Sequence, residues 1–244
     1  MKIRIDKLLV ERGLAPSRER AQSLILAGKV LVNDQKVEKA GAGVDPEAVI
    51  RLLGEDLRYA SRGGLKLERA LEHWHVEVAG RTCMDVGAST GGFTDCLLQH
   101  GAARVIAVDT GYGQIDLRLR QDTRVRLLEK TNARYLRRED VVEPVELVAM
   151  DVSFISATLV LPAVVSAAGD KLTGIIVLVK PQFESGRDQV GKGGIVRDPA
   201  AQQAAVEKVQ SALKRLGWGG SEVIESPILG TEGNREFLLY ARRV

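Results

Sequence analysis

The chain has 244 residues, of which 45% are hydrophobic and 27% are charged, and its formal net charge is +3. This length exceeds the ~100 to 200 residues of a typical domain, so a small domain and a medium one are expected. The longest apolar runs fall well below the roughly 20 residues that cross a bilayer, and the N-terminus lacks the apolar core of a secretory signal. The two cysteines, Cys83 and Cys96, lie in segments typical of a buried strand and a buried helix. These features exclude a membrane span and favour a protein of the reducing cytoplasm.

Basic residues are unevenly distributed, and their distribution is more informative than the small net charge. Lysine and arginine gather in residues 2–69 and again in residues 118–138. The second stretch contains Arg118, Arg120, Arg124, Arg126, Lys130, Arg134, Arg137 and Arg138. Such a cluster is either a solvated face or a phosphate-binding surface, and its pattern leaves both interpretations open.

The first 53 residues have the pattern of a small helix-helix-hairpin domain. Pro16-Ser17 is typical of a helix start with Ser17 as the N-cap, and Gly13 and Gly28 are typical of helix ends. The elements expected in chain order are a helix over 5–12, a helix over 17–28, a hairpin over 30–37 and a strand over 49–52. Apolar positions of the second helix face inwards, which leaves its charged side chains at the surface.

Three segments of this domain carry a resemblance: Arg4 to Leu9, Ser17 to Ala21 and Gly28 to Asn33. They resemble the small RNA-binding domain named after ribosomal protein S4. The resemblance implies that the basic side chains of these segments contact RNA, together with an arginine that follows the expected linker. These residues are Arg4, Lys7, Arg18, Arg20, Lys29 and Arg62. We therefore expect an S4-like RNA-binding domain over 1–53 and a linker over 54–61.

From Thr82 onward, strand-like and helix-like segments alternate, which predicts a Rossmann-like α/β domain with a parallel sheet over residues 62–244. Strands are expected over 82–86, 104–108, 147–150 and 173–180, with a strand-like run over 125–128. Helices are expected over 92–100, 155–167 and 199–216, and strands over 221–225 and 236–242 complete the sheet.

The sharpest local signal is the strand over 82–86, which continues into a glycine-rich turn and a helix. The turn contains Gly87, Gly91 and Gly92, and glycine permits close approach of the backbone to a ligand. Such turns lie at the carboxyl edge of a parallel sheet, where open α/β folds bind nucleotide-like molecules. An ordinary strand-turn-helix corner remains the simpler structural alternative.

Two cofactor classes use such turns, and the residues favour one of them. Ser89 stands where the dinucleotide fingerprint Gly-x-Gly-x-x-Gly needs glycine, and Asp85 would repel a pyrophosphate. The carboxylate of Asp85 suits the amino group of S-adenosylmethionine. Asp109, at the end of the next strand, is placed to accept hydrogen bonds from ribose hydroxyls. S-adenosylmethionine is therefore the expected cofactor.

Five blocks of sequence then identify the chain as a member of the TlyA, or haemolysin-A-like, family. They are residues 61–67, 85–95, 151–156, 180–184 and 193–199. The resemblance implies an FtsJ-like catalytic domain that methylates the 2′-hydroxyl of a ribose, of cytidine, in ribosomal RNA of one or both subunits. It also implies a catalytic tetrad of Lys66, Asp151, Lys180 and Glu236.

The tetrad fits the chemistry, because a ribose hydroxyl is a poor nucleophile that must be oriented and deprotonated. Lys180 is the expected base or orienting group, with Asp151 and Glu236 holding it, and Lys66 contacts RNA phosphate or ribose. The resemblance further suggests that Asn132 and Ala133 border the adenine and that Phe93 lines the methionine pocket. The expected cofactor-binding residues are thus Asp85, Gly87, Ser89, Gly91, Gly92, Phe93, Asp109 and Asn132.

Other functions remain as alternatives. The family's older name invites a membrane-active haemolysin, and an RNA-binding factor without catalysis could retain the same fold. A methyltransferase that acts on a base is less favoured, because residues 151–154 lack the catalytic motifs of that class. His73, Trp74 and His75 are more typical of packing than of a metal site, so no metal is expected. The expected partners are ribosomal RNA or ribosomal subunits and not a membrane, and the oligomeric state is left open.

Overall fold

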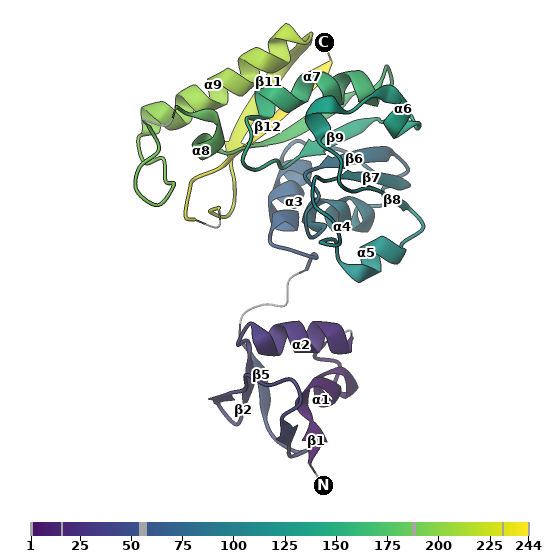
Figure 1. Ribbon diagram of the computed structural model, residues 1–244, viewed down its shortest axis with the longest axis vertical. Coiled ribbons are helices and arrows are strands. Elements are labelled where there is room, and N and C mark those ends of the chain that lie inside the picture. Colours follow the sequence, from purple (N-terminus) through teal and green to yellow (C-terminus); the bar gives the residue numbers. More distant parts are fainter. Residues whose placement is uncertain (1, 16, 54–57, 187–188, 231, 244) are drawn as a thin grey trace. The chain divides into compact units, whose positions relative to one another are not determined.

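A computed structural model (Figure 1) describes residues 2–15, 17–53, 58–186, 189–230 and 232–243. Pro16 and residues 54–57 of the expected linker lie outside the described residues. The chain divides into two compact units, Met1–Leu57 and Arg58–Val244. Below, they are called the N-terminal unit and the C-terminal unit.

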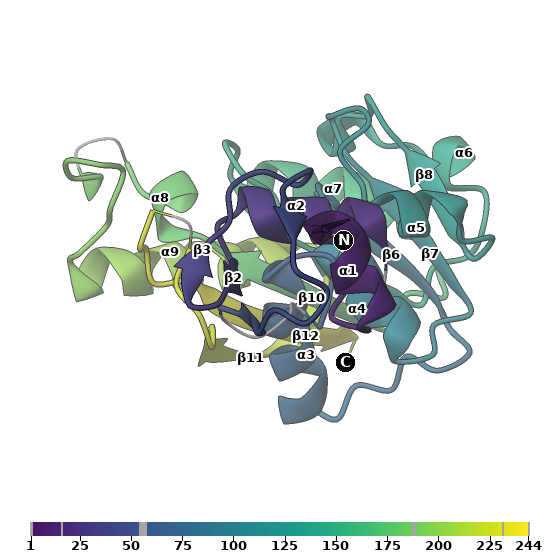
Figure 2. The same ribbon diagram turned by 90° about the horizontal axis from the view of Figure 1, so that it is seen from below.

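The N-terminal unit contains two helices and two small antiparallel sheets. Its elements are β1 (Ile3–Arg4), α1 (Ile5–Glu11), α2 (Arg18–Leu26), β2 (Val30–Val32), β3 (Gln35–Lys36), β4 (Gly43–Val44) and β5 (Ile50–Leu52). Strands β3, β2 and β5 form one sheet, and β1 pairs with β4. Figure 2 shows α1, α2 and the β2–β3 hairpin from below. Both expected helices, the hairpin and the last strand are confirmed, whereas β1 and β4 were not predicted.

Local interactions explain why this unit folds as the pattern predicted. The hydroxyl of Ser17 accepts a hydrogen bond from the backbone N–H of Arg20 at 3.2 Å, which confirms Ser17 as the N-cap of α2. Asn33 and Asp34 adopt positive φ values of 49° and 62°, as a tight hairpin turn requires. Ile5, Leu9 and Ile25 are fully buried and form the centre of a small core.

The C-terminal unit has a seven-stranded sheet in the order β11-β12-β10-β9-β6-β7-β8. Its strands are β6 (Thr82–Val86), β7 (Arg104–Val108), β8 (Val125–Leu128), β9 (Leu147–Met150), β10 (Gly174–Val179), β11 (Trp218–Glu225) and β12 (Phe237–Arg243). Its helices are α3 (Gly63–His73), α4 (Gly92–Gln99), α5 (Leu117–Gln121), α6 (Arg138–Val141), α7 (Ala157–Ala168), α8 (Pro181–Glu184) and α9 (Pro199–Arg215), with a 3₁₀ turn, η1 (Ala133–Tyr135). The α/β fold class predicted from the sequence is confirmed.

Six of the described strands of this sheet run in the same direction, and β12 alone runs against them. Strands β8, β7, β6, β9 and β10 pair in parallel, whereas β12 is antiparallel to both β10 and β11. The expected parallel sheet is confirmed, with β12 as its antiparallel strand. The chain returns from β11 to β12 as an antiparallel pair, which needs only a loop rather than a crossover helix.

Both faces of the sheet are covered, which explains the continuous apolar character of the inner strands. Alternate residues of β6 divide between two cores: Met84 packs on the side of α7 and α9, and Cys83 packs on the side of α3 and α4. Figure 1 shows α7 and α9 on one face and α3 and α4 on the other. The chain runs from β6 to β7 on one side and later returns to β9 on the other. The crevice outside the carboxyl ends of β6 and β9 is thus a topological switch point, where such sheets bind ligands.

Candidate functional site

The glycine-rich turn follows β6 and lies against the end of β9. Gly87 has a φ of +90°, and a Cβ at this position would stand 2.3 Å from the backbone oxygen of Asp151. Its N–H donates to the carbonyl of Val108 at the end of β7. A side chain at Gly87 would push apart the two strand ends, so the glycine keeps the turn and Asp151 in contact.

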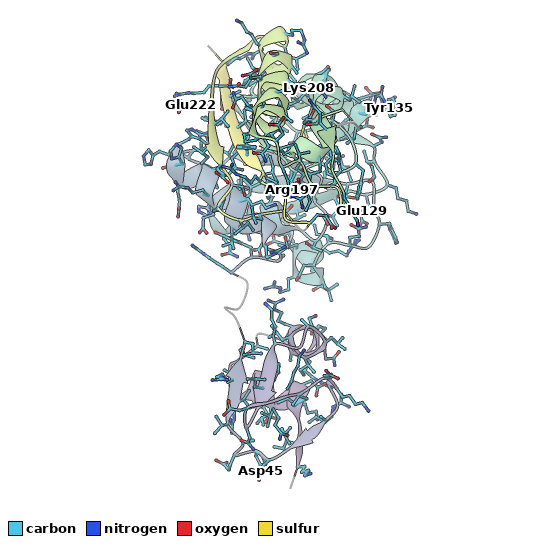
Figure 3. All side chains as sticks on the ribbon, turned by 90° about the vertical axis from the view of Figure 1, so that its left-hand side faces the viewer. Asp45, Glu129, Tyr135, Arg197, Lys208 and Glu222 are labelled. Atoms are coloured by element: carbon cyan, nitrogen blue, oxygen red, sulfur yellow. The ribbon has the colours of Figure 1, made fainter. Side chains whose placement is uncertain are left out.

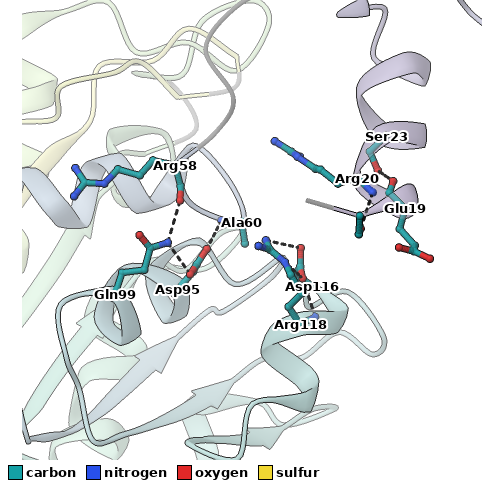
Figure 4. Close-up of polar contacts among 10 residues, drawn as sticks. Glu19, Arg20, Ser23, Arg58, Ala60, Asp95, Gln99, Asp116 and Arg118 are labelled. Atoms are coloured by element: carbon teal, nitrogen blue, oxygen red, sulfur yellow. Dashed lines mark hydrogen bonds and ion pairs between the residues drawn. The ribbon is translucent and has the colours of Figure 1, made fainter. Parts of the chain in front are cut away.

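The start of α4 packs against the segment that precedes α3. A Cβ on Gly92 would meet the hydroxyl oxygen of Ser61 at 2.2 Å. The N–H of Ala60 donates to Asp95 at 2.7 Å, and the Gln99 amide donates to the carbonyl of Arg58 at 3.0 Å (Figure 4). Residues 58–61, which the sequence assigned to the linker, therefore pack against α4 and belong to the C-terminal unit.

Two cavities open at the carboxyl edge of the sheet. The first is lined by Ser61, Arg62, Gly63, Lys66, Gly87, Ala88, Ser89, Thr90, Gly92, Phe93, Asp151, Ser153, Lys180, Ile228, Leu229 and Glu236. The second is lined by Val86, Gly87, Ser89, Val108, Asp109, Thr110, Gly111, Gln114, Thr131, Asn132, Ala133, Asp151, Val152, Ser153, Phe154, Ile155 and Val160. Gly87, Ser89, Asp151 and Ser153 line both, so the two cavities share one wall. The structure thus brings the four tetrad residues together in one cavity and most of the expected cofactor residues beside them.

The tetrad consists of two ion pairs. Lys180 Nζ lies 2.6 Å from Asp151 Oδ1 and also donates a hydrogen bond to Ser153 Oγ at 2.7 Å. Lys66 Nζ lies 2.5 Å from Glu236 Oε2. Both acids were expected to hold Lys180, whereas in the structure Asp151 pairs with Lys180 and Glu236 pairs with Lys66.

These side chains are held by different elements of the fold. Asp151 and Lys180 follow directly after the parallel neighbours β9 and β10, so both project from the same edge of the sheet. Lys66 comes from α3, and Glu236 precedes β12. The side chains of Lys66 and Glu236 are only 10% and 3% exposed, so this pair is nearly removed from water. The Lys180–Asp151 pair is the more accessible of the two, as a group that meets substrate must be.

Asp85 is fully buried beneath the glycine-rich turn and lines neither cavity. One carboxylate oxygen accepts a hydrogen bond from Thr94 Oγ1 at 2.6 Å, and the other has no hydrogen-bond partner among the described residues. Burial raises the pKa of Asp85 to about 7, against the opposing effect of the Thr94 hydrogen bond. The expected contact of Asp85 with a cofactor amino group stays a prediction, because the carboxylate lies behind the turn.

The remaining cofactor candidates are distributed around the turn. Asp109 Oδ2 accepts from the Ser89 N–H at 2.8 Å, and Oδ1 accepts from the Gly111 N–H at 2.6 Å. Asn132 caps η1 by accepting from the Arg134 N–H at 3.0 Å. Gly91 is the N-cap of α4 in the left-handed conformation and lines neither cavity. Phe93 is 3% exposed, so it belongs to the core as well as to the first cavity.

Two of the expected RNA-binding arginines also have a structural role. The carboxylate of Asp6 is fully buried and accepts hydrogen bonds from Arg4 at 2.8 Å, Arg18 at 3.0 Å and Gln22 at 3.0 Å. The hydrogen bond from Arg4, helped by those from Gln22 and Arg18, holds the pKa of Asp6 well below its usual range. The side chains of Arg4 and Arg18 are 49% and 46% exposed, so each retains surface for a ligand.

The other basic candidates differ in exposure. Lys7 and Arg62 are exposed, whereas Arg20 and Lys29 are half-buried. Arg62 lines the first cavity beside Lys66, which places it at the tetrad rather than in the N-terminal unit. Arg62 and Lys66 both belong to the C-terminal unit.

The aromatic groups around His73 and Trp74, which were considered as a metal or stacking site, and the two cysteines pack within the protein. The ring of Trp74 lies 5.3 Å from that of His73 and 5.4 Å from that of Tyr240. Across the described part of the chain, no group of three or more His, Cys, Asp or Glu side chains could hold a metal ion. Cys83 and Cys96 are both buried free thiols. Within the same residues, no helix has the length and apolarity to span a membrane.

Sequence reasoning missed three polar residues that shape the site. Ser153 contacts Lys180, Glu184 accepts hydrogen bonds at the start of α7, and the buried Asn234 side chain bonds to Val196 and Gly194. Ser153 and Glu184 lie inside blocks that carried the family resemblance, and Asn234 lies two residues before Glu236. Their position in or near these blocks was the available signal in the sequence, but the sequence does not show which residues these side chains contact.

Comparison with known proteins agrees with this geometry. Residues 59–243 match the profile of FtsJ-like methyltransferases, and residues 3–50 match the S4 domain. The chain is 47% identical over 240 residues to the "16S/23S rRNA (cytidine-2'-O)-methyltransferase TlyA" of Mycobacterium tuberculosis, covering 98% of this chain and 89% of that protein. It is 38% identical to "Hemolysin A" of Brachyspira hyodysenteriae, covering 98% and 99%.

A solved structure supports the same assignment. It comes from Streptococcus thermophilus, is described provisionally as a hemolysin, and matches with a TM-score of 0.76 at 42% identity. The match covers 100% of this chain and 89% of that one. The chain therefore belongs to the FtsJ-like methyltransferases and, within them, to the family of TlyA and hemolysin A.

Proposed function

We propose that the protein transfers a methyl group from S-adenosylmethionine to a ribose 2′-hydroxyl, of cytidine, in ribosomal RNA. The observation that carries this proposal is the convergence of the Lys180–Asp151 and Lys66–Glu236 pairs beside the glycine-rich turn. A relative that is 47% identical over 240 residues, which cover 98% of this chain, is named as a methyltransferase of this specificity.

The second cavity fits the cofactor. Gly87 leaves its wall without a side chain, and Asp109 presents a carboxylate whose further lone pairs can accept hydrogen bonds from ribose hydroxyls. Asn132 and Ala133 line the part that would border an adenine. When bound here, S-adenosylmethionine supplies an electrophilic methyl group. Gly87, Ser89, Asp109 and Asn132 are the residues that would hold it.

The Lys180–Asp151 pair acts on the acceptor hydroxyl. Lys180 Nζ is a hydrogen-bond donor beside the Asp151 carboxylate, so it can hold the hydroxyl oxygen and leave one lone pair free for the methyl group. The carboxylate of Asp151 lies beside it and can accept the hydroxyl proton. Ser153 fixes the lysine from the other side. The Lys66–Glu236 pair, being nearly buried, holds α3 against β12 and presents Arg62 to the RNA.

The N-terminal unit would dock the substrate. We assign residues 1–53 to RNA binding and 58–244 to catalysis. An exposed basic set of this kind binds phosphate and shape more than base sequence. Ribosomal RNA, alone or in a subunit, is the proposed partner, which implies that the protein works in the cytoplasm.

The decisive experiment is transfer of labelled methyl into isolated small subunits, large subunits and free ribosomal RNA. We expect label in a ribose 2′-oxygen with the wild type, and a loss of about 100-fold in kcat for Lys180→Ala, the scale of a lost orienting contact. Lys171→Ala is a matched control, since Lys171 is an exposed lysine outside both cavities. If no substrate takes label although cofactor binds, the proposed function is refuted.

A further inference from the structure

Most of the basic side chains over residues 118–138 are engaged by other groups of the protein. Most arginines of this stretch have partners on the protein itself: Arg120 with Glu129, Arg124 with Asp122, Arg126 with the carbonyls of Asp140 and Val141, Arg137 with Asp140, and Arg138 with the carbonyls of Glu143 and Ala167. A carboxylate partner offsets the charge of a cation, whereas backbone carbonyls leave the charge but engage some of its hydrogen-bond donors. The stretch as a whole is therefore not a uniform phosphate-binding surface.

Two cations of this stretch face aromatic rings instead. Lys130 Nζ lies 4.5 Å from the centroid of the Tyr112 ring, and the Arg134 guanidinium lies 5.8 Å from that of Tyr135. Tyr112 is 69% exposed and Tyr135 is 67% exposed, although tyrosine rings are ordinarily half-buried. Figure 3 shows Tyr135 at the surface of the C-terminal unit. We name Tyr112, Lys130, Arg134 and Tyr135 the tyrosine surface.

Backbone hydrogen bonds fix the tyrosine surface at the rim of the second cavity. The N–H of Lys130 donates to the carbonyl of Gly111 at 3.0 Å, which ties the segment of Lys130 to that of Tyr112. The N–H of Tyr135 donates to the carbonyl of Asn132 at 2.9 Å. Asn132 lines both the second cavity and a wide neighbouring hollow that Lys130 and Tyr135 also line. An RNA strand that crossed this rim would pass Tyr135, and Tyr112 directly follows Gly111, which lines the second cavity.

We propose that the tyrosine surface stacks unpaired nucleotides that flank the methylated one. This inference rests on the proposed function. Exposed aromatic rings paired with cations are the chemistry that binds single-stranded nucleic acid, because every base has a face to stack and every link has a phosphate to neutralise. In a duplex the base faces are already stacked on one another and cannot meet the rings. The protein therefore selects a target whose neighbours are unpaired.

The test compares Tyr112→Ala, Tyr135→Ala and the double variant in methyl transfer to ribosomal RNA. Each single substitution is expected to lower kcat/KM for RNA about 10-fold, which corresponds to the loss of one base stack. Tyr135→Phe keeps the ring and is expected to keep the wild-type value. Arg124→Ala is the control for charge alone, because Arg124 is held by Asp122. The dissociation constant of S-adenosylmethionine, measured by calorimetry, is expected to stay unchanged in all variants.

A binding measurement addresses the strandedness directly. Fluorescence anisotropy with a labelled oligocytidylate and with the same oligomer paired to oligoguanylate is expected to show a weaker complex for Tyr112→Ala only with the unpaired probe. Equal losses with both probes, or no loss in any tyrosine variant, would overturn the inference. A wild type that methylates no RNA at all would instead overturn the proposed function, so the two failures are distinguishable.

Discussion

Removal of Glu236 should destabilise the C-terminal unit strongly, because it leaves a buried lysine without its counter-charge. The side chains of Lys66 and Glu236 are 10% and 3% exposed, so little water can replace the lost partner. Breaking one side of a buried ion pair costs about 3–5 kcal/mol in free energy of unfolding. For a unit of this size each kcal/mol lowers the Tm by about 2–4 °C, so Glu236→Leu should lower it by ~6–20 °C.

The double variant Lys66→Met with Glu236→Leu should recover most of that stability. Replacing both charges by apolar side chains of similar volume removes the desolvation penalty together with the attraction, so we expect a stability within about 1 kcal/mol of wild type. Methyl transfer should remain lost in the double variant, because the residues that present the RNA are altered. Stability and activity are thereby separated in one set of proteins.

Urea unfolding followed by tryptophan fluorescence is the assay. Both tryptophans of the chain, Trp74 and Trp218, belong to the C-terminal unit, so their emission reports the unfolding of that unit without the N-terminal one. A Glu236→Leu variant as stable as the wild type would refute this prediction, because it would show that water solvates the Lys66–Glu236 pair. The prediction would also be refuted by a double variant no more stable than the single one.

Three further outcomes follow from the site. Burial raises the pKa of Asp85 to about 7, so the folded state binds this proton more tightly than the unfolded state. The free energy of unfolding should therefore fall as pH rises from about 4 to 7. In urea titrations, Asp85→Asn should flatten that pH dependence. Glu184 accepts from Ser156 Oγ at 2.5 Å and the Ala157 N–H at 2.6 Å, so Glu184→Gln should loosen the loop after β9 and lower kcat by about 10-fold while the cofactor dissociation constant is kept. Binding of ribosomal RNA should weaken steeply with added salt, as filter binding between low and physiological ionic strength would measure.

Each of these has a clear contrary result. A pH dependence of stability that is identical in Asp85→Asn would show that another group titrates. If Glu184→Gln weakened cofactor binding and left kcat intact, the carboxylate would support the cofactor cavity rather than the catalytic loop. An affinity for RNA that does not change with salt concentration would contradict a role for phosphate contacts in RNA binding.

The inner strands could be predicted to the residue from sequence, and the reason is physical. Strands β6, β7 and β9 are buried on both faces, so they appear as short continuous apolar runs between turns. Short elements with no such pattern were not predicted: β1 and β4 have two residues each, and α5 and α6 have five and four. The eleven-residue helix α3 was not predicted either. The direction of β12 could not be predicted, because strand pairing depends on the path of the chain rather than on its local pattern.

The site was predicted in kind but not in arrangement. Resemblance supplied the residue types of the tetrad, and strand ends after β9 and β10 explain why Asp151 and Lys180 meet. Which acid pairs with Lys66 depends on how α3 approaches β12, a contact across 170 positions of sequence. The burial of Asp85 likewise depends on the packing of Thr94 behind the turn, which no local pattern shows.

Under the proposed function, with the cofactor in the second cavity and the acceptor ribose in the first, the wall that the two cavities share couples the binding of cofactor and RNA. Gly87, Ser89, Asp151 and Ser153 line both, so a ligand that shifts this wall on one side changes the free energy of binding on the other. By linkage, whatever factor S-adenosylmethionine adds to the affinity for RNA, RNA must add to the affinity for S-adenosylmethionine. The demethylated cofactor touches the same wall without the methyl group, so it should carry a different coupling factor, and the size of that difference governs how readily the modified RNA leaves.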